Sequence, residues 1–74
     1  MTKLQEIEEI VERLPFLHKA NMRAYIKVIK EEHSDYLLTH MKGYANAMGV
    51  AGYITCEEYL KFGGLILEDF AEVA

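Results

Sequence analysis

The chain has 74 residues and a formal net charge of −4, with 51% hydrophobic and 27% charged residues. This length allows one domain, which we place over residues 1–74, and the composition is too apolar for a disordered tail. The single cysteine excludes an intramolecular disulfide, and without a secretory leader or an apolar run of roughly 20 residues we expect a cytoplasmic protein with no membrane span.

The charge is distributed unevenly along the chain. Residues 1–14 carry a net charge of −2, residues 15–42 carry +2, and residues 43–74 carry −4. A net-acidic protein is repelled on average by phosphate backbones. Nucleic acid is therefore disfavoured as a partner unless the basic middle is presented alone.

The first predicted element is an amphipathic helix over about residues 3–14. Its apolar positions recur at steps of three and four, at Leu4, Ile7, Ile10, Val11 and Leu14. Thr2 and Gln5 fit a capping box at its start, and Pro15 ends it by disfavouring a helical Leu14. In the connection that follows, we expect Phe16 and Leu17 to fold back over the core.

Residues 20–51 are predicted as two helices, over about 20–33 and 35–51, or as one long kinked helix. One unbroken apolar stripe runs through Met22, Ile26, Ile29, His33, Tyr36, Leu37, His40, Met41, Tyr44, Ala47, Met48 and Ala51. Ser34 or Asp35 is a natural N-cap, which favours a break there. A single long helix would instead leave apolar surface that only a second copy could bury.

The stretch "AGYITCEEYLKFGG", residues 51–64, has the frame of a calcium-binding loop. If Ala47 is loop position 1, Gly52 takes position 6 and Glu58 position 12, but the ligand positions 1, 3 and 5 are Ala47, Gly49 and Ala51. None of these supplies a side-chain oxygen. We therefore predict a corner between two helices, with Gly52 ending the first and Thr55 and Glu58 forming a capping box for the second, where Ile54 acts as a hydrophobic staple.

The last helix is predicted over about residues 55–73. Its apolar face comprises Cys56, Tyr59, Leu60, Gly63, Ile66, Leu67, Phe70, Val73 and Ala74. Because Gly63 has no side chain, we expect a close helix crossing there. With no strand-like alternation, the pattern indicates an all-α fold, a small three- or four-helix bundle.

Two histidines and the cysteine are the candidate metal ligands. His33 and His40 lie seven residues apart, and Cys56 would add a soft donor. No spacing typical of zinc sites occurs, so we predict no metal and no cofactor, with the histidines partly buried and Cys56 a small buried hydrophobe. With one serine, Ser34, and no triad signature, we also predict no catalytic residues and no enzymatic activity.

Four basic residues repeat along the second predicted helix. Lys19, Arg23, Lys27 and Lys30 form a stripe that is the best nucleic-acid signal in the chain. A solvated helix face explains the same pattern, because lysine stems cover core edges while their charges stay in water. Binding of nucleic acid through this stripe is kept as an alternative function.

The polar face of the last predicted helix carries one apolar residue, Leu65. It is set among the charged side chains of Glu58, Lys61, Glu68, Asp69 and Glu72. A leucine ringed by carboxylates suits docking on a basic patch with an apolar centre. We take these six residues as the candidate partner-binding site, and expect Leu65→Glu to abolish binding without lowering stability.

These observations predict a non-catalytic module that works by binding another protein, with a second copy of itself as one candidate. The corner "AGYIT..EEY" also resembles corners in small proteins of phages and mobile elements of Gram-positive bacteria. That resemblance implies an accessory regulator or inhibitor of a host protein, which is a second alternative.

Overall fold

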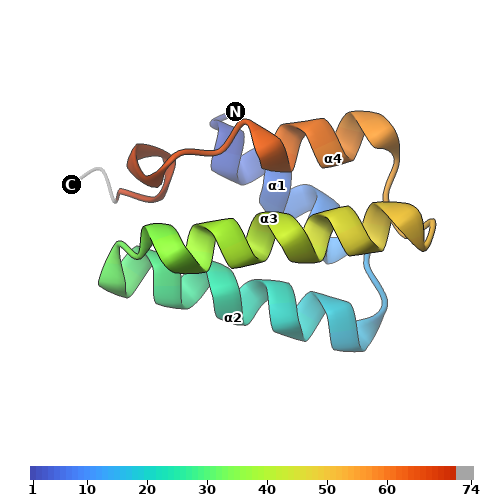
Figure 1. The fold of residues 1–74 in the computed structure, drawn as a ribbon, viewed down its shortest axis with the longest axis horizontal. Helices are drawn as coiled ribbons and strands as arrows, with labels where there is room; N and C mark the ends of the chain where they lie inside the picture. The colour runs from blue at the N-terminus through green and yellow to red at the C-terminus, as the bar shows by residue number, and fades with distance from the viewer. Residues whose placement is uncertain (72–74) are drawn as a thin grey trace.

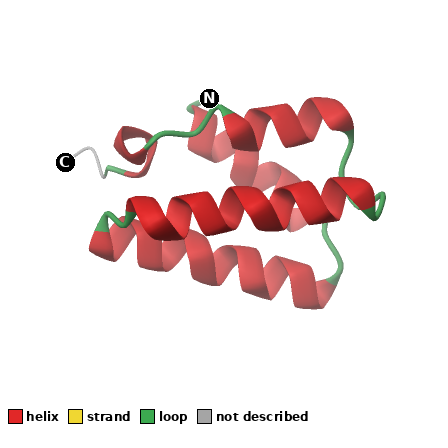
Figure 2. Cartoon of the chain, viewed as in Figure 1, coloured by secondary structure: helices red, strands yellow, loops and turns green. Residues whose placement is uncertain are grey.

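The computed structural model describes residues 1–71 and contains four α-helices followed by one 3-10 turn (Figure 1). The elements are α1 (Lys3–Glu12), α2 (Phe16–Glu32), α3 (Asp35–Val50), α4 (Cys56–Gly63) and η1 (Leu67–Phe70). Helices and short connections account for these residues, and no strand occurs among them (Figure 2). The predicted all-α bundle is confirmed, and it has four helices.

The four helices pack as a closed ring of neighbours. Helix α1 contacts α2 and α4, and α3 contacts the same two helices from the other side. Helices α2 and α3 form the long antiparallel hairpin along the longest axis of the molecule (Figure 1). The η1 turn packs on α1 and α2, so that residues 67–70 cover one end of the bundle.

Helix α1 begins as predicted. The Thr2 hydroxyl accepts a hydrogen bond from the Gln5 backbone N–H at 3.1 Å, and the Gln5 side chain accepts from the Thr2 N–H at 2.9 Å. These two bonds satisfy donors that a helix start otherwise leaves unpaired.

Helix α2 begins earlier than predicted, immediately after Pro15. Proline has a fixed φ that suits a helix start, and here its φ is −54°. The first turn therefore projects Phe16 and Leu17 outward, with 83% and 67% of their surface exposed. The prediction that these two side chains cover the core is wrong.

A break at residues 33–34 separates α2 from α3, so residues 20–51 form two helices. His33 has left-handed backbone angles, φ 50° and ψ 43°, and the Ser34 hydroxyl accepts from the Leu37 N–H at 3.2 Å. The break changes which side of α3 faces inward. Its buried residues are Leu38, Met41, Ala45 and Met48.

The predicted continuous stripe is therefore only partly right in α3, where Met41 and Met48 are buried as predicted and Leu37 and Tyr44 pack half-buried against the core. Tyr36, His40, Ala47 and Ala51 are exposed, although the stripe placed them in the core. A uniform advance of 100° per residue holds only within one helix, and the left-handed residue at 33 breaks it.

The corner after α3 has the predicted geometry. Gly52 has a φ of +86°, the Tyr53 N–H bonds the Met48 carbonyl at 2.9 Å, and the Gly52 N–H bonds the Gly49 carbonyl at 3.1 Å. This is a Schellman arrangement, in which a glycine at the left-handed position closes the helix end. Ile54 then enters the core.

The final segment differs from the predicted long helix because α4 ends at Gly63. Two successive glycines weaken the helix, at about 1 kcal/mol each relative to alanine. The chain then turns, and Leu65 and Phe70 reach the core from outside any α-helix. A Cβ placed on Gly63 would meet nothing within 4 Å, so the predicted close crossing at this glycine is also wrong.

The buried residues of α4 also differ from the predicted face. Phe62 is the buried residue of this helix, while Leu60 is exposed and Tyr59 lies half-buried against the core. Ile66 is exposed as well. Val73 and Ala74 of the predicted face lie outside the described residues.

Candidate functional site

The predicted partner-binding site lacks its apolar anchor. Leu65, the proposed anchor, is fully buried, so the prediction that it stands exposed is wrong. Lys61 lies on α4, with its Nζ 4.0 Å from a carboxylate oxygen of Glu6 on α1. Glu68 is exposed in η1, the Asp69 carboxylate accepts from the Ile66 N–H at 2.8 Å, and Glu72 lies outside the described residues.

Glu58 has a structural role at the start of α4. Its carboxylate accepts a hydrogen bond from the Thr55 N–H at 2.9 Å and forms an ion pair with Arg13. The Thr55 hydroxyl accepts in return from the Glu58 N–H at 3.1 Å, which confirms the capping box. The bond from Thr55, followed by the nearby Arg13 guanidinium, holds the pKa of Glu58 below its usual value.

The basic stripe of α2 faces the glutamates of α1. Arg23 forms an ion pair with Glu12, and the Lys30 Nζ lies 4.0 Å from a Glu8 oxygen. Lys27 lines the same groove between the two helices, while Lys19 sits half-buried one turn into α2. Carboxylates across the groove reduce the positive potential of this stripe.

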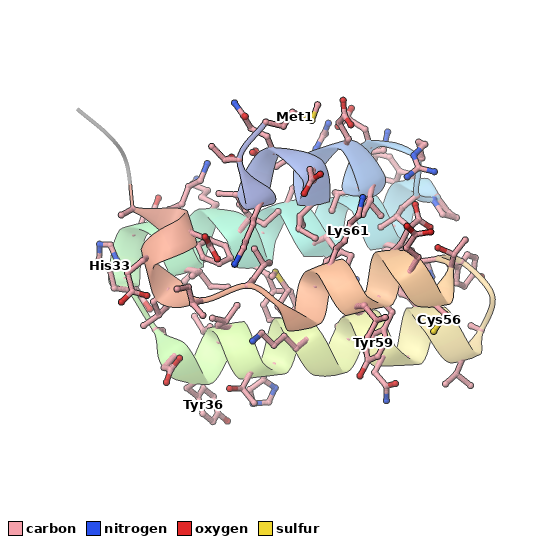
Figure 3. All side chains as sticks on the ribbon, turned by 90° about the horizontal axis from the view of Figure 1, so that it is seen from above. Met1, His33, Tyr36, Cys56, Tyr59 and Lys61 are labelled. Carbon is pink, nitrogen blue, oxygen red and sulfur yellow. The ribbon has the colours of Figure 1, made fainter. Side chains whose placement is uncertain are left out.

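The candidate metal ligands are far from forming a site. His33 lies at the α2–α3 turn and Cys56 at the opposite end of the molecule, at the start of α4 (Figure 3). Residues 1–71 bring together no group of three His, Cys, Asp or Glu side chains that could hold a metal ion. Both histidines and the cysteine are exposed, which corrects the prediction that they are partly or fully buried.

A different set of residues converges on the outer side of the α2–α3 hairpin. Three shallow hollows follow one another between the two helices. Two of them are lined by Asn21, Ala24, Tyr25, Val28, Leu37, Thr39, His40, Gly43 and Tyr44. The third is lined by His18, Tyr44, Ala47, Met48, Ala51 and Tyr53. We call these residues the α2–α3 face.

The α2–α3 face contains no lysine, arginine, aspartate or glutamate among its lining residues. The neighbouring groove between α1 and α2 is instead lined mostly by charged side chains. They are Glu8, Glu12, Arg23, Lys27, Lys30 and Glu31. In a chain that is 27% charged, this contrast sets the α2–α3 face apart from the surface beside it.

Tyr44 is the central residue of the α2–α3 face and lines all three hollows. Its hydroxyl lies 2.6 Å from His18 Nδ1 and accepts from the Asn21 side chain at 3.1 Å. Tyr25 meets its ring edge-on, with centroids 6.1 Å apart, and Tyr53 lies 4.6 Å from the His18 ring. These contacts hold the rings in place.

The exposed stripe of α3 continues this surface. Tyr36, His40, Gly43, Ala47 and Val50 follow at steps of four, three, four and three, which gathers them on one side of the helix. Tyr36 and Val50, at the two ends, are 72% and 84% exposed, and the Tyr36 ring lies 4.4 Å from that of His40. Tyr36 points away from the body of the bundle (Figure 3).

Sequence reasoning missed this surface because it assigned several of its residues to the core. Tyr36, His40, Tyr44, Ala47 and Ala51 all belonged to the predicted buried stripe. The N-cap residue Ser34 could have revealed this surface. If the 100° advance is counted anew from Ser34, Leu38 and Ala45 can be placed inside and Tyr36 and His40 outside.

No family model matches this chain, and the searches of curated proteins and of solved structures also found no match. Within residues 1–71, every helix is too short or too polar to cross a bilayer.

Proposed function

We propose that this protein is a small non-catalytic module that binds another protein through the α2–α3 face. The observation that supports the proposal is the uncharged, tyrosine-lined surface along both helices. Patches of exposed apolar and aromatic side chains on small proteins commonly mark sites of association.

The composition of the face agrees with this role. Centres of protein interfaces are depleted in charged side chains and enriched in tyrosine, because the ring adds contact area while the hydroxyl still finds a hydrogen bond. Tyr25, Tyr44 and Tyr53 line the face and Tyr36 lies beside it on α3, so this region holds four of the five tyrosines in the chain. The hydrogen bonds of Tyr44 with His18 and Asn21 hold its ring in one position, which reduces the entropy cost of binding.

Ala47→Lys tests the proposal. Ala47 is exposed and lines the hollow around Tyr44, so the lysine should place a charge in the proposed interface while the helix still forms. We expect the immobilised wild-type chain to retain a binding protein and the variant to lose it, with unchanged circular dichroism.

Asn46→Lys is the matched control. It adds the same charge to the same helix, but one residue away, about 100° around the helix axis from Ala47. We expect it to bind like the wild type. Equal capture by the wild type and by Ala47→Lys would remove the α2–α3 face from the proposal.

Binding of nucleic acid is the weaker alternative, because the α1 glutamates lie against Arg23 and Lys30. If the protein binds nucleic acid, its affinity for nucleic acid should fall steeply as the salt concentration rises. The affinity should also fall when Lys27 and Lys30 are replaced by neutral residues. The alternative role as a regulator or inhibitor of a host protein remains a prediction, since no comparison bears on it.

A further inference from the structure

We infer that the partner that fits the α2–α3 face is a second copy of this chain, with α3 packed antiparallel on α3 and α2 on α2. The two copies would be related by a two-fold axis perpendicular to the helices. This inference rests on the proposed function, because it names the occupant of the same face.

The charges at the two ends of the hairpin favour this arrangement. The turn between α2 and α3 carries Glu31, Glu32 and Asp35, whereas residues 13–20 and 47–55 at the other end contain Arg13 and Lys19 and no acidic side chain. An antiparallel pair places each acidic turn at the end of the partner's hairpin where α2 and α3 carry no carboxylate, beside the α4 start at which Glu58 is paired with Arg13. A parallel pair would gather the carboxylates of both copies at one end, and like charges at an interface disfavour association.

Two small residues lie where the helices of the two copies would come closest. Ala24 is eight residues before the end of α2 at Glu32, and Gly43 is eight residues after the start of α3 at Asp35. Because the helices are antiparallel, these two residues lie at the same height in the hairpin. A Cβ added to Gly43 would meet nothing within 4 Å, so the space above this glycine is open.

The larger exposed side chains lie towards the ends of the same surface. Tyr36 begins the α3 stripe and Val50 ends it, so the antiparallel pair brings the tyrosine of one copy to the valine of the other. An interface across a two-fold axis has to be complementary to itself, and a small centre with large ends meets that requirement.

The size of the hairpin is sufficient for such an interface. Helices of 17 and 16 residues are each about 25 Å long, and two helices side by side are about 20 Å wide. Their outer side projects to about 500 Å², and the relief of its side chains brings its accessible surface towards the ~800 Å² that each partner contributes to a stable interface. Because no Lys, Arg, Asp or Glu lines the three hollows, formation of the dimer would remove no charged side chain from water there.

Sedimentation equilibrium of the full chain tests the inference. We expect a mass twice the monomer's 8.5 kDa, and Gly43→Lys should raise the dissociation constant by about 100-fold, because each copy then places a lysine at the axis. Lysine favours a helix more than glycine does, so this variant should fold. Asn46→Lys should leave the dimer unchanged.

Cysteine cross-linking tests the antiparallel arrangement. In a Cys56→Ser background, Gly43→Cys should form a disulfide-linked dimer on mild oxidation, because residue 43 faces its own copy across the axis. Asn46→Cys in the same background should link far less.

Three outcomes would overturn the inference: a monomer at a concentration of about 0.5 mM, a dimer that Gly43→Lys leaves intact, or equal cross-linking at positions 43 and 46. A monomeric chain that still captures another protein through Ala47 would overturn self-association alone and leave the proposed function standing.

Discussion

His33 ends α2 in the left-handed conformation that residues with a Cβ rarely adopt, and it does so with a φ of 50°. Its N–H donates a hydrogen bond to the Ile29 carbonyl at 2.8 Å, so the backbone of His33 closes the end of α2. Its side chain lies in solvent. Gly52 occupies the equivalent position after α3 and carries no such strain.

We therefore expect His33→Gly to stabilise the protein by about 1 kcal/mol, because glycine adopts this conformation without the steric penalty. Chemical denaturation gives the free energy of unfolding directly. Glu9→Gly, at an exposed position inside α1, is the control and should lose about 1 kcal/mol. A loss of stability in His33→Gly would show that the imidazole contributes more than the strain costs.

At the scale of single elements, the start of α4 shows how a short helix is held. An eight-residue helix is marginal by itself. The reciprocal bonds between Thr55 and Glu58 fix its first turn, and the ion pair from Glu58 to Arg13 connects that turn to the end of α1. Glu58 therefore joins two elements that are far apart in the sequence.

The lowered pKa of Glu58 predicts a pH dependence of folding. A carboxyl group whose pKa is lower in the folded state contributes stability above its unfolded pKa of about 4.3, and this contribution is lost as the pH falls through the folded value. Thermal melts of the wild type should therefore show a decline below about pH 4.3. Glu58→Gln keeps a capping-box side chain but has no charge to lose, so its decline should be smaller. Identical pH profiles would contradict this role.

Features of the single elements also determined which side of each helix is buried. The spacing of Leu4, Ile7, Ile10 and Val11 was sufficient to predict the buried side of α1, because that helix is continuous and its cap was recognised. In α3 the same reasoning was right for Met41 and Met48 but wrong for Tyr36, His40 and Ala47. The left-handed residue at 33 restarts the helix, and these three residues became part of the exposed side of α3.

At the scale of the whole molecule, the core depends on residues that belong to no α-helix. Leu65 follows α4, and Phe70 lies in η1, yet both are fully buried against the helices. They close the bundle after Gly63 and Gly64 have ended α4. A chain of 74 residues buries little surface, so each such contact is a large part of the total stability.

Leu65→Ala should therefore cost about 2–5 kcal/mol, the usual effect of removing a buried leucine side chain. Leu60→Ala is the matched control, because Leu60 is 64% exposed and should change stability by less than about 0.5 kcal/mol. Equal effects in urea denaturation would contradict the burial of Leu65. Leu65→Glu, expected from the sequence to leave stability unchanged, should instead unfold the protein.

The sequence by itself determined the helical class, the capped starts of α1 and α4, and the glycine corner at Gly52. These features depend on neighbours within a few residues, where hydrogen-bond geometry and side-chain spacing are set locally. Only the tertiary structure decided that Leu65 is buried, that Phe16 and Leu17 are exposed, and that Tyr36, His40 and Ala47 lie on the outer side of α3. Those outcomes depend on how the four helices pack against one another and on where the chain turns back after α4. Neither the helix packing nor the turn is determined by residues close together in the sequence.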